Sequence, residues 1–341
     1  MRHRLFIPIL YVALGCVISA LFVTCMTTGA VKIPISQVWA ALTGGQLENG
    51  VWEAIVLRSR LPQTVTALVA GAALACGGLL LQTLFANPLA DPSILGVSSG
   101  AGLGVAVVVL ALGGSVGSLA GTLSTVAGAM AGASAVLALI IALSAVVRSN
   151  VMLLVAGLMI GYMASSAVSL FSFWGAAESV KSFSVWGMGD FGGVSLSRLP
   201  YFVAIAAVGL VWALMMMKPL NAMLLGESYC RNLGVSVGKL RVSVLLSTGL
   251  LTAVVTAFCG PVSFIGLAVP HMARLVTGTS DHRVLMPVTM LMGAAVALLC
   301  NLLTVVLGGG GLLPLNVVTP LLGAPVIIYV IVNKRKIAYF N

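Results

Sequence analysis

Charged side chains are scarce in this sequence of 341 residues, because Asp, Glu, Lys and Arg together make up only 7% of it. A typical soluble domain carries about 25% charged residues, which keep its surface solvated. The deficit therefore excludes a large soluble globule. Hydrophobic residues account for 60% of the chain, which is the composition of a polytopic membrane protein.

Signatures of enzymatic chemistry are also missing. The sequence nearest to a nucleotide-binding loop, residues 234–240 (GVSVGKL), has three residues between its glycines where that loop has four, and no Ser or Thr follows its lysine. The six cysteines form no CxxC or Cys/His metal pattern, and no Ser/His/Asp set or carboxylate pair stands out. We expect no ATP hydrolysis by this chain, no other catalysis, and no metal or cofactor bound to it.

Acidic residues are the scarcest charged group, with 7 Asp and Glu in the whole chain. Their near-absence from the apolar runs disfavours ion- or proton-coupled transport, which places ionisable groups within the membrane. The net charge of +10 does not indicate nucleic-acid binding, since the basic residues stand singly between apolar runs, as topology signals do. The 39 glycines favour close approach between transmembrane helices.

Apolar runs long enough to cross a membrane dominate the chain. A spanning helix needs about 20 apolar residues, and the sequence offers ten candidates: 6–27, 62–84, 94–113, 117–146, 151–173, 199–217, 242–259, 262–277, 285–307 and 316–332. We predict an all-α polytopic membrane protein in which residues 1–341 form a single transmembrane domain. The first run exceeds a signal-peptide core of roughly 7–15 residues, so we expect it to be retained.

Ten spans place both termini on one side of the membrane, and the distribution of Lys and Arg selects that side. Cytoplasmic loops carry an excess of Lys and Arg. With cytoplasmic termini, twelve basic residues lie inside and five outside. The inside group is Arg2, Arg4, Arg148, Lys218, Arg231, Lys239, Arg241, Arg274, Arg283, Lys334, Arg335 and Lys336, and the outside group is Lys32, Arg58, Arg60, Lys181 and Arg198. The sequence therefore predicts that both termini are cytoplasmic.

Residues 218–241 (KPLNAMLLGESYCRNLGVSVGKLR) form the longest polar interval in the second half of the chain. A segment this polar must leave the hydrocarbon, where each charge costs several kcal/mol. Its four Lys and Arg residues mark it as cytoplasmic, and Gly226 and Gly234 divide it into short helix-compatible pieces. We interpret this coupling segment as the surface on which a separate ATPase acts.

Two proline-containing motifs each admit a structural and a functional interpretation. Residues 82–92 (QTLFANPLADP) can form a tight cytoplasmic turn in which Asn87 and Asp91 cap the next helix. Residues 260–274 (GPVSFIGLAVPHMAR) contain a proline kink followed by His271. A structural role is favoured for this histidine, because no acidic or cysteine partner is spaced to support metal or proton chemistry. Arg274 is expected to reach the cytoplasmic interface.

Other features concern the outer side and the C-terminal span. Residues 312–325 (LLPLNVVTPLLGAP) predict either a broken helix beside a permeation path or a kinked packing helix. Arg58 and Arg60 form an exposed guanidinium pair that suits carboxylates of a partner protein or anchors at the interface by snorkelling. A short surface helix is expected within residues 180–188, and spans 2–5 and 7–10 hint weakly at an inverted repeat.

Several motifs in order resemble the permease subunits of type II ABC importers, the family that takes up iron–siderophores, haem and cobalamin. They are residues 60–62 (RLP), 87–102 (NPLADPSILGVSSGAG), 186–194 (WGMGDFGGV), 224–234 (LLGESYCRNLG), 264–275 (FIGLAVPHMARL), 281–287 (DHRVLMP) and 316–326 (NVVTPLLGAPV). The resemblance implies a ten-helix fold in the bacterial inner membrane and a second permease subunit, expected to be a second copy. It also implies two cytoplasmic ATPases, which use ATP and Mg²⁺, and an extracytoplasmic binding protein.

The same resemblance assigns site residues by position. ATPase coupling falls to Leu224, Leu225, Gly226, Glu227, Arg231, Leu233 and Gly234, and the cytoplasmic gate to Asn87, Leu89, Ser149, Asn150 and Val151. Docking of the binding protein falls to Arg58 and Arg60. The elements expected to line the pore contain Trp186 and Gly187, and the expected broken helix contains Pro314 and Pro320.

Two departures from the family pattern concern the outer side. Asn301 and Val305 stand where the family often has an Asp and an Arg in the ninth span, and Leu312 stands in the place of a common Glu before span 10. The first difference puts one arm of binding-protein docking in doubt, and the second is expected to alter the outer rim of the pore.

Three functional hypotheses follow. The first is a permease for an iron complex, either a siderophore or haem, and the second is the same machine carrying cobalamin. The third is a secondary transporter that needs no ATPase. The third hypothesis requires an acidic residue at a site within the membrane, and the sequence offers no good candidate for one.

Overall fold

The computed structural model describes residues 2–113, 119–147, 149–308 and 313–332, and they contain helices and loops but no β-strand. The long helices are α1 (Arg2–Thr27), α4 (Leu61–Leu84), α6 (Leu119–Val146), α7 (Asn150–Trp174), α9 (Leu199–Met215), α12 (Val237–Cys259), α14 (His282–Leu307) and α15 (Leu315–Val332). The shorter elements are α2 (Ile35–Thr43), α3 (Gly50–Ile55), η1 (Val56–Arg60), η2 (Pro92–Leu95), α5 (Val97–Ala106), η3 (Val107–Ala111), α8 (Ala177–Gly187), α10 (Met217–Met223), α11 (Glu227–Asn232) and α13 (Ile265–Thr277).

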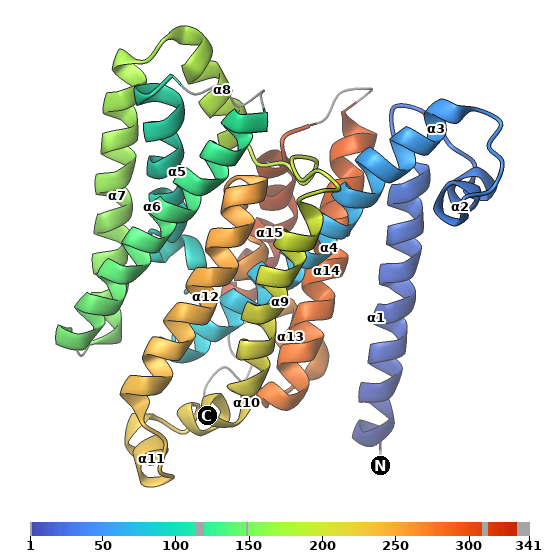
Figure 1. Ribbon diagram of the computed structural model, residues 1–341. Coiled ribbons are helices and arrows are strands. Elements are labelled where there is room, and N and C mark those ends of the chain that lie inside the picture. The colour runs from blue at the N-terminus through green and yellow to red at the C-terminus, as the bar shows by residue number, and fades with distance from the viewer. Residues whose placement is uncertain (1, 114–118, 148, 309–312, 333–341) are drawn as a thin grey trace.

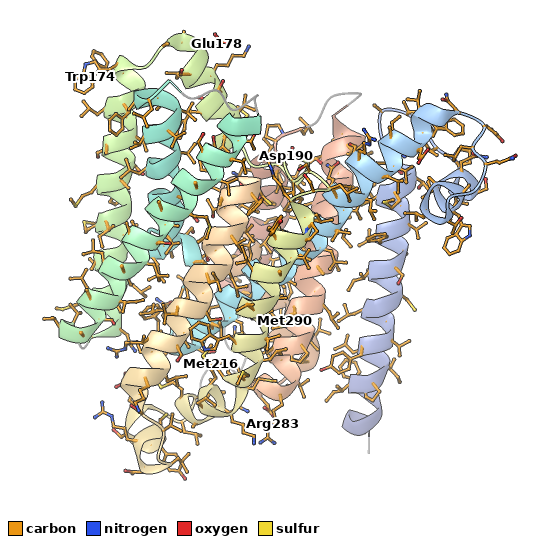
Figure 2. The ribbon with its side chains drawn as sticks, in the orientation of Figure 1. Trp174, Glu178, Asp190, Met216, Arg283 and Met290 are labelled. Carbon is orange, nitrogen blue, oxygen red and sulfur yellow. The ribbon has the colours of Figure 1, made fainter. Side chains whose placement is uncertain are left out.

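The helices pack side by side as a bundle with two distinct ends (Figure 1). One end carries α2, α3 and α8, and we call it the α8 end; the opposite end carries α10, α11 and the start of α1, and we call it the α11 end. Figure 2 shows Glu178 at the α8 end and Arg283 at the α11 end. The N-terminal helix therefore starts at the end that holds the coupling segment. Four of the basic residues predicted to be cytoplasmic lie outside the described residues: Arg148, Lys334, Arg335 and Lys336.

The predicted all-α fold is confirmed, with apolar helical segments at the ten expected places in the described residues. Six helices are long and apolar enough to span a membrane, and α9 with α10 forms a seventh candidate that is bent by 52°. Three shorter apolar segments complete the set: Val97–Ala111, Ile265–Thr277 and Leu315–Val330. The inverted repeat stays a prediction.

Several of the predicted boundaries are wrong, and for two of them the backbone shows the cause. The second span begins at Gly50 rather than near residue 62, because the π-helical turn η1 carries the helix up to Pro62, where an α-helical hydrogen bond cannot form. The eighth span begins at Ile265 rather than 262, because Gly260 and Phe264 adopt φ of 73° and 70°. Its 13 residues extend only about 20 Å, less than the hydrocarbon core.

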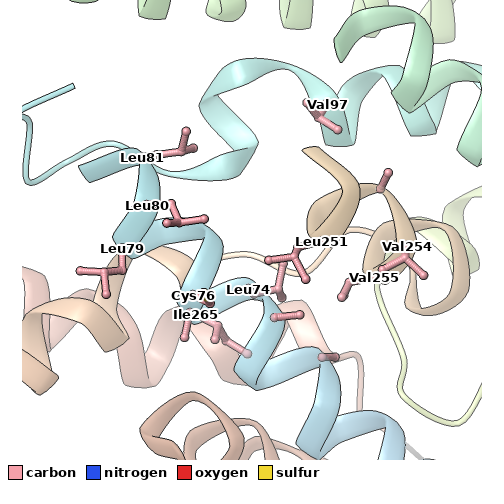
Figure 3. Close-up of a cluster of buried hydrophobic side chains, with 14 of the residues drawn as sticks. Leu74, Cys76, Leu79, Leu80, Leu81, Val97, Leu251, Val254, Val255 and Ile265 are labelled. Atoms are coloured by element: carbon pink, nitrogen blue, oxygen red, sulfur yellow. The ribbon is translucent and has the colours of Figure 1, made fainter. Parts of the chain in front are cut away.

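The core of the bundle surrounds α4. Its buried side chains Leu74 and Leu79 lie in one cluster with Leu251 of α12 and Ile265 of α13 (Figure 3). Glycines allow the helices to approach closely, since a Cβ at Gly78 would lie 1.8 Å from the carbonyl oxygen of Gly266 in α13. The position of α4 is therefore fixed by backbone contacts as well as by apolar packing.

Replacing Gly78 with alanine is expected to push α4 away from α13 and to destabilise the bundle by about 1–3 kcal/mol, the usual cost of overpacking. Thermal unfolding of the detergent-solubilised protein measures this effect. The control is Gly15→Ala in α1, because a Cβ at Gly15 has no neighbour within 4 Å. Equal melting temperatures for the two variants contradict the prediction.

Candidate functional site

The 85–91 loop, which joins α4 to η2, is shaped by its own side chains. Asn87 accepts a hydrogen bond from the backbone N–H of Leu89 at 2.9 Å, and Asp91 accepts one from the N–H of Ser93 at 2.9 Å. Asp91 therefore caps the next helical turn as expected, whereas Asn87 closes a turn inside the loop. Burial raises the pKa of Asp91, although the hydrogen bonds from Ser93 oppose the rise. The Leu89 side chain is exposed.

Two neighbouring helices hold this loop against the bundle. His271 of α13 is 1% exposed, and its Nε2 lies 2.7 Å from the carbonyl oxygen of Pro88. Asn150, the first residue of α7, donates a hydrogen bond from Nδ2 to the carbonyl oxygen of Leu84 at 3.2 Å. The structural role favoured for His271 is therefore a specific one, because its ring meets the backbone of the loop.

The last turn of α4 carries two buried polar side chains that open the 82–92 motif but received no role from the sequence. Gln82 accepts a hydrogen bond from Nη1 of Arg274 at 2.6 Å and donates one to the carbonyl oxygen of Leu267 at 3.2 Å. Thr83 Oγ1 lies 2.8 Å from Nε2 of His282. Arg274 is buried, because Gln82 offers its guanidinium a partner inside the bundle, and its expected position at the cytoplasmic interface stays a prediction.

His282, which is fully buried, connects the last turn of α4 to α10. Its Nδ1 and its backbone N–H each lie 2.8 Å from Oδ1 of Asn221, and Asn221 donates to Asp281 at 2.5 Å. Burial tends to raise the pKa of Asp281, but hydrogen bonds from the Arg283 N–H and from Asn221 lower it below its ordinary value. These polar residues all stand where an apolar run ends, which is the sequence signal that could have identified them.

The other expected gate residues lie at the start of α7. Ser149 caps this helix by accepting a hydrogen bond from the N–H of Met152 at 3.4 Å, and the Val151 side chain is exposed. Through the contact of Asn150 with Leu84, the structure brings the start of α7 to the 85–91 loop. The gating role of both segments stays a prediction.

The coupling segment forms part of α10, all of α11 and the start of α12 at the α11 end (Figure 1). Gly226 and Gly234 flank α11 with φ of 95° and 79°, in the range that favours glycine. The side chains of Leu225 and Leu233 are exposed, whereas that of Leu224 is half-buried. Exposed leucines beside charged residues suit docking of a partner, which stays a prediction.

Glu227 is the electrostatic centre of the coupling segment. It forms an ion pair with Arg231 at 3.5 Å and another with Arg241 of α12 at 3.3 Å. The Arg231 side chain is 69% exposed, so its pair contributes little to stability. Arg241 is only 8% exposed, and its guanidinium also donates hydrogen bonds to Val147 and Asn150. These residues and the end of α6 line a cavity of about 780 Å³.

At the α8 end, the expectation of an exposed arginine pair is wrong for Arg60. Arg58 is exposed, but Arg60 is only 7% exposed. The Arg60 guanidinium donates hydrogen bonds to the carbonyl oxygens of Met26 at 2.8 Å and Thr27 at 3.1 Å, and also to that of Val31. The side chain turns inward because the end of α1 and the chain after it offer these acceptors. Docking of a partner stays a prediction for Arg58.

Replacing Arg60 with alanine is therefore expected to lower the melting temperature, because a buried carbonyl left without its donor costs about 1–3 kcal/mol. Replacing Arg58 with alanine is expected to leave the melting temperature unchanged, because the side chain is exposed. Thermal unfolding in detergent measures both. A larger loss for Arg58→Ala than for Arg60→Ala contradicts the assignment.

The expected pore elements meet at a junction built by Asn316. Its Nδ2 donates to the carbonyl oxygens of Pro261 at 2.7 Å and Gly187 at 3.4 Å, which joins α8 to the loop before α13. The expected broken helix is wrong, because α15 runs unbroken from residue 315 to 332 with Pro320 inside it. Pro314 precedes the first turn, where backbone N–H groups need no partner within the helix.

Trp186 packs against Phe183, with ring centroids 5.9 Å apart, and its indole N–H is buried without a partner among the described residues. The structure thus places Trp186, Gly187 and Pro314 around one junction. Pro320 lies further along α15. Whether these residues line a pore stays a prediction.

Asn301 and Val305, which depart from the family pattern, line a cavity of about 290 Å³ at the α8 end together with Arg60. Asn301 accepts a hydrogen bond from Nε2 of Gln63 at 2.9 Å. Leu312 lies outside the described residues. Within the described part of the chain, no cluster of three or more His, Cys, Asp or Glu residues is placed to hold a metal ion.

Comparisons with known proteins identify the family of the chain. The model of the FecCD transport family matches residues 17–333. The vitamin B12 import system permease protein BtuC of Klebsiella pneumoniae is 34% identical over 292 residues, covering 85% of this chain and 86% of that protein. The protein of the same name from Salmonella typhi is 36% identical over 284 residues, covering 83% and 85%.

A solved structure also resembles the whole bundle. It is described as a metal-chelate type ABC transporter in an inward-facing conformation, and the TM-score is 0.84 with 29% sequence identity. The match covers 96% of this chain and 99% of that chain. The similarity therefore extends over nearly all of the helices described above.

Proposed function

The chain belongs to the FecCD transport family, and we propose from this membership that it forms the membrane pore of an ATP-driven importer of cobalamin. It is a multi-pass ABC importer permease subunit and not an enzyme. Membership argues against the hypothesis of a secondary transporter. The cargo, the partners and the orientation in the membrane are proposed below from separate observations.

The match to permeases named for vitamin B12 import carries the choice of cargo. It extends over 83–85% of this chain and 85–86% of those relatives, so it is not a local similarity. Sequence motifs placed an iron complex first and cobalamin second, and the comparisons support the second better. Cobalamin is a large, rigid ligand, which suits a pore without a high-affinity site of its own.

The two ends of the bundle suit two different partners. The α11 end presents the exposed Leu225 and Leu233 on a short helix flanked by glycines, which suits insertion into a cleft of an ATPase subunit. That subunit binds ATP and Mg²⁺. The α8 end carries the exposed Arg58, which suits a carboxylate of an extracytoplasmic binding protein.

The orientation follows from the basic residues. The α11 end carries Lys218, Arg231, Lys239 and Arg283 as exposed side chains, so the positive-inside rule places it in the cytoplasm of a bacterial inner membrane. The start of α1 lies at this end, which gives a cytoplasmic N-terminus. With the ten spans predicted from the sequence, we expect the C-terminus to be cytoplasmic as well.

A second copy of the chain is the proposed neighbour of α7. Large apolar side chains of this helix are exposed at Val155, Met159, Tyr162 and Met163, which repeat along one helical face. Two such faces around a common axis can enclose a path that ends at the 85–91 loops.

Reconstituted proteoliposomes test the proposed cargo. The permease, the ATPase and the binding protein encoded beside it are combined, and uptake of radiolabelled cyanocobalamin, a ferric siderophore and haemin is compared. We expect cyanocobalamin to accumulate only when ATP is present on the ATPase side. Accumulation of the siderophore or haemin without cyanocobalamin overturns the assignment.

An iron complex remains the second candidate, because the structural neighbour is described as a metal-chelate type transporter. Cobalamin and ferric siderophores are both metal chelates, so this similarity does not separate them. The uptake comparison does, because the same reconstituted complex, with its one binding protein, is offered each labelled ligand in turn.

A further inference from the structure

We propose that Arg241 and Asn150 are positioning residues that connect α11 to the 85–91 loop, so that movement of the coupling segment reaches the gate through side-chain hydrogen bonds. This inference rests on the proposed ATPase docking at α11. It goes beyond the docking proposal because it names the residues that transmit the motion. One of them, Arg241, had no assigned role.

The first connection joins α11 to α12. Glu227 Oε1 and Nη2 of Arg241 lie 3.3 Å apart, and the Arg241 side chain is 10% exposed. The Glu227 side chain is 35% exposed, and both residues line the cavity of about 780 Å³, so solvent partly screens the pair. Its geometry is sensitive to any shift of α11, because Glu227 is the first residue of that helix.

The second connection joins α12 to α7. The same Nη2 of Arg241 donates to Oδ1 of Asn150 at 3.0 Å, and Nη1 donates to the carbonyl oxygen of Val147 at 3.4 Å. Arg241 therefore contacts both sides of the short connection between α6 and α7. A displaced guanidinium pulls on the start of α7.

The third connection joins α7 to the loop. The amide of Asn150 uses both of its ends, because Oδ1 accepts from Arg241 while Nδ2 donates to the carbonyl oxygen of Leu84 at 3.2 Å. Leu84 is the last residue of α4, directly before the 85–91 loop. Three successive contacts thus run from Glu227 to the point where the loop begins.

A parallel route reaches the preceding residue of α4. Asn221 of α10 contacts His282, and His282 contacts Thr83, each at 2.8 Å. Both routes begin in helices of the α11 end and finish at adjacent residues of α4. Apolar packing surrounds α4 along its length and does not distinguish its last turn. The two routes of polar contacts both end at that turn, which is therefore where movement of the α11 end reaches α4.

A nitroxide spin label on the loop tests the relay directly. Leu89→Cys supplies an exposed attachment site, and Cys16→Ser removes the exposed cysteine, since the other five are buried. The label mobility is recorded in the permease–ATPase complex with and without a non-hydrolysable ATP analogue. We expect a nucleotide-dependent change in the parent protein, reduced about tenfold in Arg241→Gln.

Two further variants separate the relay from folding. Asn150→Asp keeps the acceptor for Arg241 but loses the donor to Leu84, so only the last contact breaks, and the nucleotide response is expected to fall as in Arg241→Gln. Arg283→Gln removes an exposed positive charge at the same end, and its response is expected to equal that of the parent.

The outcomes distinguish this inference from the proposed function. If the mobility of the label in the parent protein does not change with nucleotide, the proposed relay is overturned. It is also overturned if the separate variants Arg241→Gln and Asn150→Asp both keep the full nucleotide response. Failure of cyanocobalamin uptake, with the label responding as expected, overturns the cargo assignment and leaves the relay supported.

Discussion

Gly226→Val is expected to reduce ATP-driven uptake of cyanocobalamin by roughly 5- to 150-fold, the factor that corresponds to about 1–3 kcal/mol of backbone strain. Gly226 adopts φ 95° and ψ 156° at the start of α11, a conformation nearly restricted to glycine. A Cβ there has no neighbour within 4 Å, so the effect comes from the backbone and not from a collision. The start of α11 must turn, and Glu227 moves with it.

Uptake and ATP hydrolysis by reconstituted complexes measure this effect, and we expect hydrolysis to persist without transport. The matched control is Gly44→Val, because Gly44 also has a positive φ of 73° and no neighbour within 4 Å, but it lies after α2 at the α8 end. An equal loss of uptake in both variants would falsify a specific role for Gly226 in coupling.

His271→Ala is expected to loosen the 85–91 loop. The half-buried Pro88 carbonyl loses its donor, which costs about 1–3 kcal/mol and raises the population of the open loop by roughly 5- to 150-fold. Amide hydrogen exchange of peptides covering the loop measures this directly, because the N–H groups of Asn87, Leu89 and Ala90 are hydrogen-bonded there. Uptake is expected to fall and ATP hydrolysis to become less dependent on the binding protein.

His271→Gln is the matched variant, because the glutamine Nε2 can take the place of the imidazole Nε2 and donate to the same carbonyl. We expect exchange in the loop to stay close to that of the parent. If His271→Gln loosens the loop as much as His271→Ala does, the hydrogen bond to Pro88 is not what holds it.

The helices themselves could be predicted, because burial of an apolar helix in lipid depends on local composition. Two of the misplaced boundaries have causes that composition does not show. The π-helical turn before Pro62 and the positive φ of Phe264 are backbone states set by packing against other helices. A count of apolar residues cannot register them.

The charged residues were predicted less well, and Arg60, Arg241 and Arg274 show why. Arg60 was expected in an exposed pair, Arg274 at the cytoplasmic interface, and Arg241 in a segment that leaves the hydrocarbon because charges there are costly. Each is buried instead, because carbonyl or amide oxygens from distant parts of the chain accept its hydrogen bonds. Sequence gives the cost of burying a charge but does not show which acceptors will be there to offset it.

The sequence by itself determined the class of molecule, its ten apolar segments, the polar coupling segment between α9 and α12, and the family. These properties depend on composition and on the order of short motifs, both of which are local. Only the tertiary structure decided that Asn150, His271 and His282 contact the last turn of α4 and the loop after it, and that Arg241 contacts Asn150. Residues up to 199 positions apart, such as Thr83 and His282, meet there because close helix packing brings them within hydrogen-bonding distance, and no local pattern encodes that distance.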